Sequence, residues 1–285
     1  MTATQLKRHG LFYWALIRET CVKWDADNIS RLSAALAFYT IFSLAPLLIL
    51  AIAVAGLFFG HSAARIEVVG QLQSIVGDVG AQYINNLIEL AQKPSSTLIA
   101  SIGGFITLMV GATSTFVELQ ESLNIIWKTE ARGNGFHYFL HKRLLSFAGI
   151  LSIGTMILLL LIAGAVLGFM SRHLSGVVPA YFLLLSWANM FFSFGVIAAL
   201  FAAIYKILPD TKVKWKDVWM GALMASLLFS FGKYFIGLYL RHSSMGSLYG
   251  AAGSLVIILL WIYYSAQILF FGAEFTEVYA RRSKR

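Results

Sequence analysis

The run SAALAFYTIFSLAPLLILAIAVAGLFF at residues 33–59 decides the fold, because it contains no charged side chain. A bilayer has a hydrocarbon core about 30 Å thick, which about 20 apolar helical residues can cross. The rest of the chain has the same character: 59% of its 285 residues are hydrophobic and 12% are charged. Soluble domains carry roughly 25% charged residues. The sequence therefore predicts an all-α integral membrane protein.

Six apolar runs of this kind predict a bundle of six transmembrane helices. The predicted spans are 33–59, 98–117, 144–170, 181–205, 217–240 and 250–277. We expect an amphipathic N-terminal segment at 1–32, the transmembrane domain at 33–277 and a basic tail at 278–285. No cleavable signal peptide is expected, because charged residues interrupt the short apolar run before the first span.

The distribution of basic residues predicts the orientation of the bundle. Seventeen of the 22 Lys and Arg residues lie in the N-terminal segment, in the loops at 118–143 and 206–216, and in the tail. The three loops on the other side hold four (Arg65, Lys93, Arg172 and Arg241). Because loops rich in Lys and Arg stay in the cytoplasm, both termini are predicted to be cytoplasmic. We assign the net charge of +9 to topology and anionic lipid, and not to nucleic acid.

With both termini in the cytoplasm, the segment 61–96 is predicted to be external, and its apolar residues follow a regular pattern. Apolar residues recur in it at helical spacing (Val69, Leu72, Val76, Val79, Tyr83 and Leu87). This spacing predicts one or two amphipathic helices over the outer mouth of the bundle. A lid and an interfacial helix with no gating role are both open interpretations.

Small residues and one proline indicate how the spans pack. Helices associate in lipid through small residues at four-residue intervals, as at Gly103, Thr107, Gly111 and Thr115, and again at Ala222, Ser226 and Ser230. A groove lined by residues 113–115 is the alternative to a packing seam. Pro46, in the middle of the first span, lacks a backbone donor and predicts a kink or a gating position.

Lys233 is the leading candidate for a binding residue, because a charge within a membrane span usually faces protein or a water-filled cavity. Snorkelling of its long side chain to the surface is the alternative. Its expected partner is an anionic headgroup, or an acidic or amide side chain of another span. The other candidate substrate-binding residues are polar side chains at membrane depth (Asn189 and Gln267) and basic side chains at the outer rim (Arg172 and Arg241).

Other chemical signals are sparse. Glu118, Glu121 and Glu274 stand at the predicted inner ends of their spans, where they can attract cations, relay protons or pair with basic loops. The spacing of the six histidines and the single Cys21 predicts no metal site or disulfide. No catalytic constellation and no cofactor motif is present, so we expect a protein that is not an enzyme.

Five stretches carry a resemblance to a known family. They are LSAALAFYTIFSLAPLL at 32–48, LNIIW at 123–127, ILPDTKVKWKDVWMGAL at 207–223, FGKYFIGLYL at 231–240 and SLYGAAGSLVIILLWIYYSAQILFFGAE at 247–274. In this order they resemble the YihY / virulence factor BrkB family of bacterial inner-membrane proteins, some members of which have carried a ribonuclease BN label. The resemblance implies six spans, a bacterial inner-membrane location and no known cofactor. The family pattern includes a lysine at Lys233 and GAE at 272–274.

Three functions are open to such a protein. A transporter or flippase-like protein for an anionic lipid or amphiphile in envelope biogenesis would use Lys233 and the basic rims. A scaffold would recruit envelope proteins without transport. A ribonuclease needs acids or histidines clustered around metal ions, and the 13 acids here are scattered. The sequence favours the transporter and argues against the ribonuclease; it leaves the oligomeric state open.

Overall fold

The computed structural model describes residues 3–60, 113–129, 179–242 and 251–283, together with short pieces between 62 and 89. All described elements are helices, and these residues contain no strand. The labelled helices are α1 (Ala3–Ala26), α2 (Ile29–Phe59), α6 (Pro179–Ile207), α7 (Trp215–His242) and α9 (Ala251–Ser283). A further helix covers residues 113–126. The predicted span at 144–170, most of the span at 98–117, and Arg172 lie outside the described residues.

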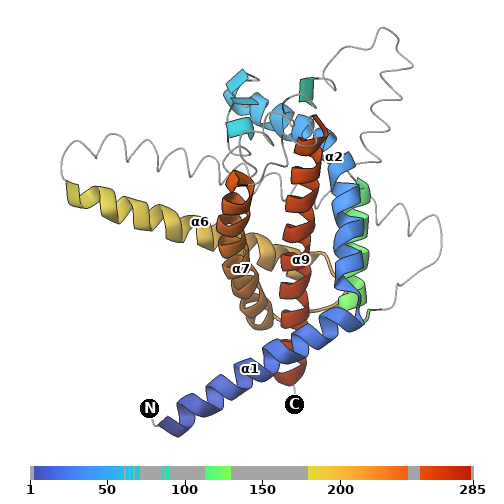
Figure 1. The fold of residues 1–285 in the computed structure, drawn as a ribbon, viewed down its shortest axis with the longest axis vertical. Helices are drawn as coiled ribbons and strands as arrows, with labels where there is room; N and C mark the ends of the chain where they lie inside the picture. The colour runs from blue at the N-terminus through green and yellow to red at the C-terminus, as the bar shows by residue number, and fades with distance from the viewer. Residues whose placement is uncertain are drawn as a thin grey trace.

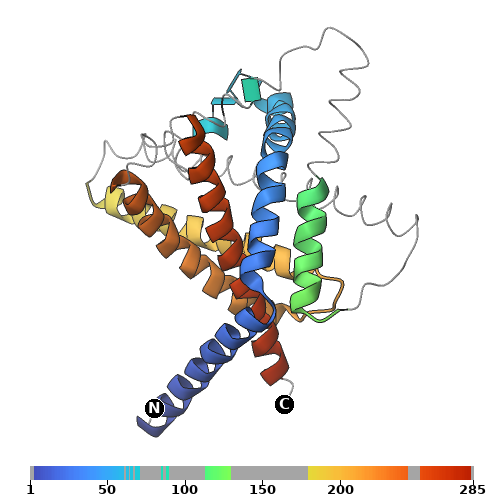
Figure 2. The same cartoon turned by 45° about the vertical axis from the view of Figure 1, so that its right-hand side comes forward.

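The described helices form an upright bundle whose two chain termini lie at one end (Figures 1 and 2). We call this the terminal end and the opposite one the distal end. Helices α2 and α7 run away from the terminal end, α9 and the helix over 113–126 return toward it, and α6 crosses the bundle obliquely. Helix α9 packs against both α2 and α7, and α6 packs against α7. Helix α1 crosses beneath the bundle and contacts α9 and α2.

Four of the predicted spans are single helices, and each helix extends beyond the predicted span at one or both ends. Helix α2 begins at Ile29 and α9 continues to Ser283, so the residues predicted as tail start as helix. Two described stretches, Trp215–Phe235 and Ile258–Ser283, are long and apolar enough to cross a membrane. The break between α1 and α2 falls at Asn28, whose φ of 53° is a left-handed conformation that Asn tolerates better than most residues.

Glycine permits a close approach between α7 and α9. A methyl group at Gly221 would lie 2.5 Å from the carbonyl oxygen of Gly272 and would overlap the hydroxyl of Thr276. A methyl group at Gly272 would lie 2.7 Å from Cβ of Ala225. The sequence predicted a seam along α7, and Ala222 and Ser226 of that seam are buried. Gly221 and Ala225, the neighbours of these two residues, make the close contacts with Gly272 of α9.

A polar network joins the loop between α6 and α7 to the helix over 113–126. The carboxylate of Asp210, in the loop before α7, accepts hydrogen bonds from Gln120 Nε2 at 3.0 Å and Asn124 Nδ2 at 2.8 Å. The Asp210 backbone N–H donates to Asn124 Oδ1 at 2.9 Å. The helix over 113–126 then ends with Lys128 at φ 51° and with Thr129 N donating to Asn124 O at 2.9 Å, which satisfies a terminal carbonyl.

The pieces described between residues 62 and 89 lie at the distal end (Figure 1). They are helical, as the spacing over 61–96 predicted. Val68 and Ile88 are buried in a cluster with Ile52 of α2 and Trp261 of α9. Arg65 holds two of the pieces together, donating to Asn85 Oδ1 at 2.8 Å and pairing with Glu89 at 2.7 Å. The residues from Leu72 to Tyr83 in the predicted pattern lie outside the described part.

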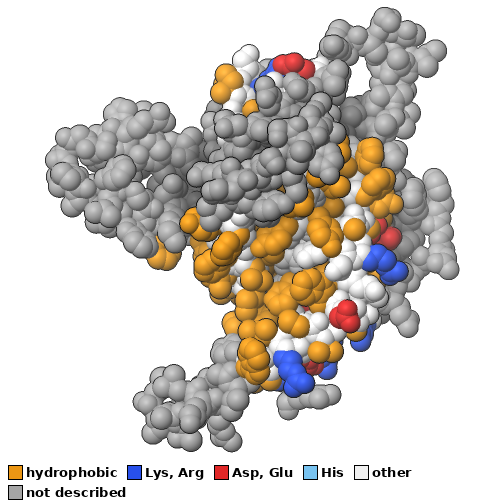
Figure 3. Space-filling view, viewed as in Figure 1, with side chains coloured by type: hydrophobic (Ala, Val, Ile, Leu, Met, Phe, Trp, Pro, Cys, Tyr) orange, Lys and Arg blue, Asp and Glu red, His pale blue; other side chains and the backbone are white. Residues whose placement is uncertain are grey.

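One face of the bundle is apolar across its centre. Figure 3 shows hydrophobic side chains there, with acidic and basic side chains at the right-hand and lower edges and at the top. Along α7, large apolar side chains are exposed at every fourth position from Trp215 to Phe231 (Trp215, Trp219, Leu223, Leu227 and Phe231). A helix face of this kind is suited to lipid tails and not to water.

Candidate functional site

Lys233 lies near the distal end of α7 with its side chain exposed. Phe231, Tyr234 and Phe235 beside it are exposed as well. Within the described part of the chain, Lys233 forms no hydrogen bond and no ion pair. The structure therefore places an ammonium group without a described partner among aromatic side chains on the outside of the bundle.

Gly232 sets the direction of Lys233. A methyl group at Gly232 would lie 2.6 Å from Cζ of Tyr264, so this point of α7 packs directly on α9. Successive helical residues are turned by about 100°, which directs Lys233 away from the contact with α9. Gln267 lies on α9, half-buried, and makes no described hydrogen bond with Lys233.

The other predicted binding residues are only partly visible. Asn189 lies in α6 and Arg241 in α7, but their side chains lie outside the described residues. The same holds for the ring of Pro46, through which α2 continues as a helix. Near Pro46, Thr40 Oγ1 donates to Leu36 O at 2.7 Å.

One polar contact joins α2 to the helix over 113–126 near the middle of the bundle. The hydroxyl oxygens of Ser43 and Thr115 lie 2.6 Å apart. Ser43 is buried, so this interhelical bond supplies a polar partner where lipid offers none. Thr115 therefore packs on α2, as the prediction of a seam requires.

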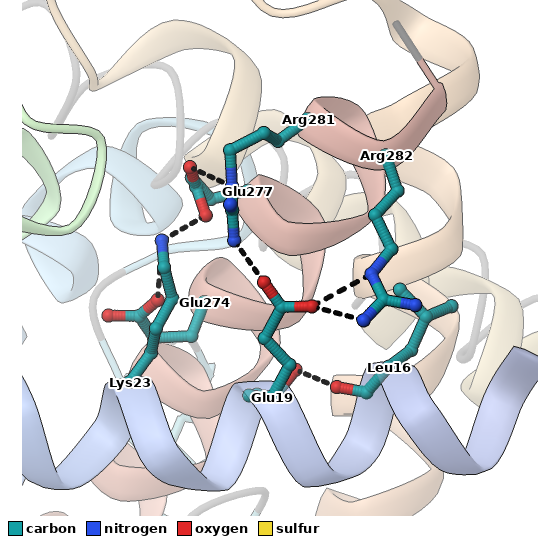
Figure 4. Close-up of polar contacts among 8 residues, drawn as sticks. Leu16, Glu19, Lys23, Glu274, Glu277, Arg281 and Arg282 are labelled. Atoms are coloured by element: carbon teal, nitrogen blue, oxygen red, sulfur yellow. Dashed lines mark hydrogen bonds and ion pairs between the residues drawn. The ribbon is translucent and has the colours of Figure 1, made fainter. Parts of the chain in front are cut away.

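Glu274 forms an ion-pair junction with α1 at the terminal end (Figure 4). Its side chain is fully buried, and one carboxylate oxygen lies 3.9 Å from Lys23 Nζ. Lys23 also pairs with Glu277, which in turn pairs with Arg281 one turn along α9 at 3.4 Å. Lys23 is thus the cation closest to the buried Glu274 carboxyl group among the described ion pairs, and neither Glu274 oxygen has a described hydrogen-bond partner.

Glu19 forms the second half of this junction. It pairs with Arg281 and accepts a hydrogen bond from Arg282 Nε at 2.7 Å. Burial alone would raise the pKa of Glu19, but the hydrogen bonds and charges of Arg282 and Arg281 outweigh it and hold the pKa below its usual value. The stabilisation from Glu19 is therefore present above about pH 4.5 and is lost as the pH falls through its lowered pKa.

Apolar contacts complete the attachment of α1. Leu16 is buried with Phe275 and Val278 of α9, and the rings of Trp24 and Phe271 pack edge to face with centroids 5.8 Å apart. The second half of α1 is thus fixed to α9 by both charge and packing.

Glu118 and Glu121 stand apart from that junction, on the helix over 113–126. Partial burial, together with the charge of Glu121, raises the pKa of Glu118. The three acids predicted at the inner ends of the spans thus belong to two different helices, and the described ion pair of Glu274 connects it to Lys23 of α1. No group of three potential metal ligands occurs within the described ranges.

Sequence reasoning missed the contacts that join distant parts of the chain. Glu19 and Arg282 are 263 residues apart, and Asn124 and Asp210 are 86 residues apart. In the sequence, each of these polar residues has the character of a side chain exposed to water or to the membrane interface. Their contacts were indicated only by their positions near predicted helix ends and by the pattern ILPD at 207–210.

Known proteins that are similar to this chain are bacterial membrane proteins. A UPF0761 membrane protein of Verminephrobacter eiseniae is 29% identical over 93% of this chain and 62% of its own length. The UPF0761 membrane protein RSc1559 of Ralstonia nicotianae is 27% identical over 91% of this chain and 57% of its own length. A UPF0761 membrane protein of Cronobacter sakazakii is 26% identical over 90% of this chain and 85% of its own length.

No solved structure matches the chain. The chain spans about three fifths of the length of the first two relatives. The sequence profile of the family described as Virulence factor BrkB matches residues 20–285. Together with the apolar helices, these matches show that the chain is an integral membrane protein and belongs to the virulence factor BrkB family.

Proposed function

We propose that this protein is a transporter or flippase-like protein that moves an anionic lipid or amphiphile across the bacterial inner membrane during envelope biogenesis. The observation that carries the proposal is the exposed ammonium group of Lys233, which has no partner among the described residues. An anionic headgroup would supply that partner, and the exposed apolar side chains of α7 would accommodate its acyl chains. We propose no enzymatic activity, cofactor or nucleic-acid partner.

Geometry supports a headgroup in this position. Lys233 is 18 residues beyond Trp215, which corresponds to about 27 Å along a helix. This is close to the roughly 30 Å thickness of the hydrocarbon core. If Trp215 marks one boundary of the membrane, Lys233 lies near the other, at the depth where hydrocarbon meets headgroups.

The alternative is a scaffold that recruits envelope proteins without transport. The first half of α1 favours it, because Trp14 is 68% exposed and this part of the helix extends beyond the bundle (Figure 2). An amphipathic helix in that position can lie in the membrane interface or dock a partner. Lipid transport requires no such partner.

Variants of Lys233 test the proposed binding role. Lys233→Met should leave abundance and melting temperature unchanged, because the ammonium has no described protein partner, but it should abolish activity in a genetic complementation assay. Lys233→Arg keeps the charge with a different shape and should retain part of that activity. Full activity of Lys233→Met would exclude the headgroup role, and a lower melting temperature would instead indicate a structural ion pair.

We further propose six spans with both termini in the cytoplasm, as the basic loops suggest. Support comes from the shared position of the two termini (Figure 1). In a background without the exposed Cys21, single cysteines at Ser62, Ser175 and Ser243 should react with an impermeant maleimide in intact spheroplasts. Cysteines at Asn134 and Lys212 should react only after permeabilisation. Labelling of position 212 in intact spheroplasts would refute this topology.

A further inference from the structure

The start of α7 carries a second concentration of cationic and aromatic side chains. Lys212, Lys214 and Lys216 are exposed, and none of them has a described ion pair or hydrogen bond from its side chain. Trp215 lies between Lys214 and Lys216 in the sequence, and Trp219 follows one turn later. The exposed fractions of these two tryptophans are 52% and 42%. We call these five residues the basal patch.

Lys206 holds the basal patch in place. Its ammonium group lies 5.7 Å from the centre of the Trp215 ring, a cation–π distance, and it donates a hydrogen bond to the carbonyl of Val213. This lysine is therefore occupied with the loop and with Trp215. The three lysines of the basal patch remain directed to the surroundings, beside a tryptophan ring whose position is fixed.

Trp215 of the basal patch and Lys233 lie on the same side of α7. Eighteen residues make five helical turns, so Trp215 lies on the same face as Lys233, and Lys216 lies on the same face as Tyr234. Each end of α7 thus presents a lysine beside an aromatic residue, about 27 Å from the other end. Trp219, Leu223 and Leu227 form an exposed apolar surface between the two ends.

We propose that the basal patch binds the headgroup of an anionic glycerophospholipid in the leaflet at the terminal end, with the acyl chains along the exposed apolar surface of α7. Charge complementarity favours this occupant, because the lysines are cationic and without described partners. Tryptophan favours the membrane interface, where its amphipathic ring meets both headgroups and hydrocarbon. A soluble acidic partner would satisfy the lysines but would leave Leu223 and Leu227 uncovered.

This inference deepens the proposed function, since one helix would then hold an anionic headgroup near each leaflet. The basal patch would bind lipid even if no lipid crosses the membrane. Binding at the patch and transport through Lys233 can therefore fail separately.

Photo-crosslinking with mass-spectrometric mapping tests the basal patch. The full-length protein is reconstituted in phosphatidylcholine nanodiscs containing phosphatidylglycerol with a headgroup diazirine. Crosslinks should appear in peptides covering residues 206–224, and the matching phosphatidylcholine probe should label them far less. A lysine near an anionic surface contributes roughly fivefold in affinity, so Lys212→Gln/Lys214→Gln/Lys216→Gln should reduce labelling by at least about that factor.

A matched variant controls for net charge. Arg18→Gln/Arg31→Gln/Lys128→Gln removes three exposed cations outside the patch and should leave this labelling unchanged, as should Lys233→Met. Lys212→Arg/Lys214→Arg/Lys216→Arg should retain it. If the triple glutamine variant does not fold, Lys216→Gln alone should show a smaller reduction.

Three results would overturn the proposal. They are undiminished labelling in a folded glutamine variant, equal labelling by the phosphatidylcholine probe, and displacement by inorganic phosphate beyond the effect of sodium chloride at equal ionic strength. The last result would indicate a site for soluble phosphate instead of a lipid. If the patch labels as expected but Lys233→Met retains full function, the basal site stands and the proposed function fails.

Discussion

Gly221→Ala should strongly reduce the amount of folded protein in the membrane. The added methyl group would lie 2.5 Å from the Gly272 carbonyl oxygen and would overlap Thr276. Because one of these obstacles is backbone, α7 and α9 would have to separate. Overpacking of a well-packed contact costs about 1–3 kcal/mol, and we expect the upper part of that range. The measurement is the melting temperature of the purified protein, together with its abundance in membranes.

Gly195→Ala provides the matched control. Gly195 is also a helical glycine, in α6, but a methyl group there would meet no atom within 4 Å. Alanine is preferred over glycine within a helix by about 0.5–1 kcal/mol, so this variant should be as stable as the wild type or more so. Equal melting temperatures for the two alanine variants would show that α7 and α9 do not pack in this way.

Asn124→Ala should cause the second large effect. It removes a hydrogen bond to the Asp210 carboxylate and the acceptor for the Asp210 backbone N–H, and Asn124 is buried. A hydrogen bond to a charged group contributes about 1.5–3 kcal/mol. Since Asp210 is exposed, we expect a total loss of about 2 kcal/mol, measured as the free energy of unfolding in mixed micelles.

A double-mutant cycle assigns that loss to the contact itself. Asp210→Ala alone should be similarly destabilising, and Asn124→Ala/Asp210→Ala should be much less destabilising than the sum of the two, because the pair is removed together. Asp25→Ala removes another exposed acid of the terminal end and should have little effect. Additive losses in the double variant would contradict the contact.

The helices were predictable because lipid imposes a simple rule: a long apolar run must satisfy its backbone groups within itself. This is why the spans at 33–59 and 250–277 correspond to α2 and α9. The ends were underestimated because α9 continues past the apolar run, where Glu277 and Arg281 pair along it. Arg281 and Arg282 lie beyond the predicted span at 250–277, and Glu19 of α1 pairs with both of them.

The candidate site was predictable to a lesser degree. Lys233 was singled out because a cation is rare within an apolar run; the structure shows its side chain exposed, and its binding role stays a prediction. That Gly221 meets α9, or that Lys23 pairs with Glu274, depends on the rotation and register of helices far apart in the chain. A single sequence shows which small and charged residues are present. Which of them contact one another is known only from the packed structure.

The most direct test of the proposed function is lipid movement in reconstituted vesicles. Protein is incorporated into liposomes that contain phosphatidylglycerol with a fluorescent headgroup, and dithionite is added outside to destroy the accessible label. Wild-type protein should expose label from the inner leaflet as well, so that fluorescence falls below that of protein-free liposomes. Lys233→Met should restore the protein-free level, with Lys233→Arg between the two. If wild-type vesicles protect as much label as protein-free ones, or if Lys233→Met acts like the wild type, this chain does not move anionic lipid through Lys233.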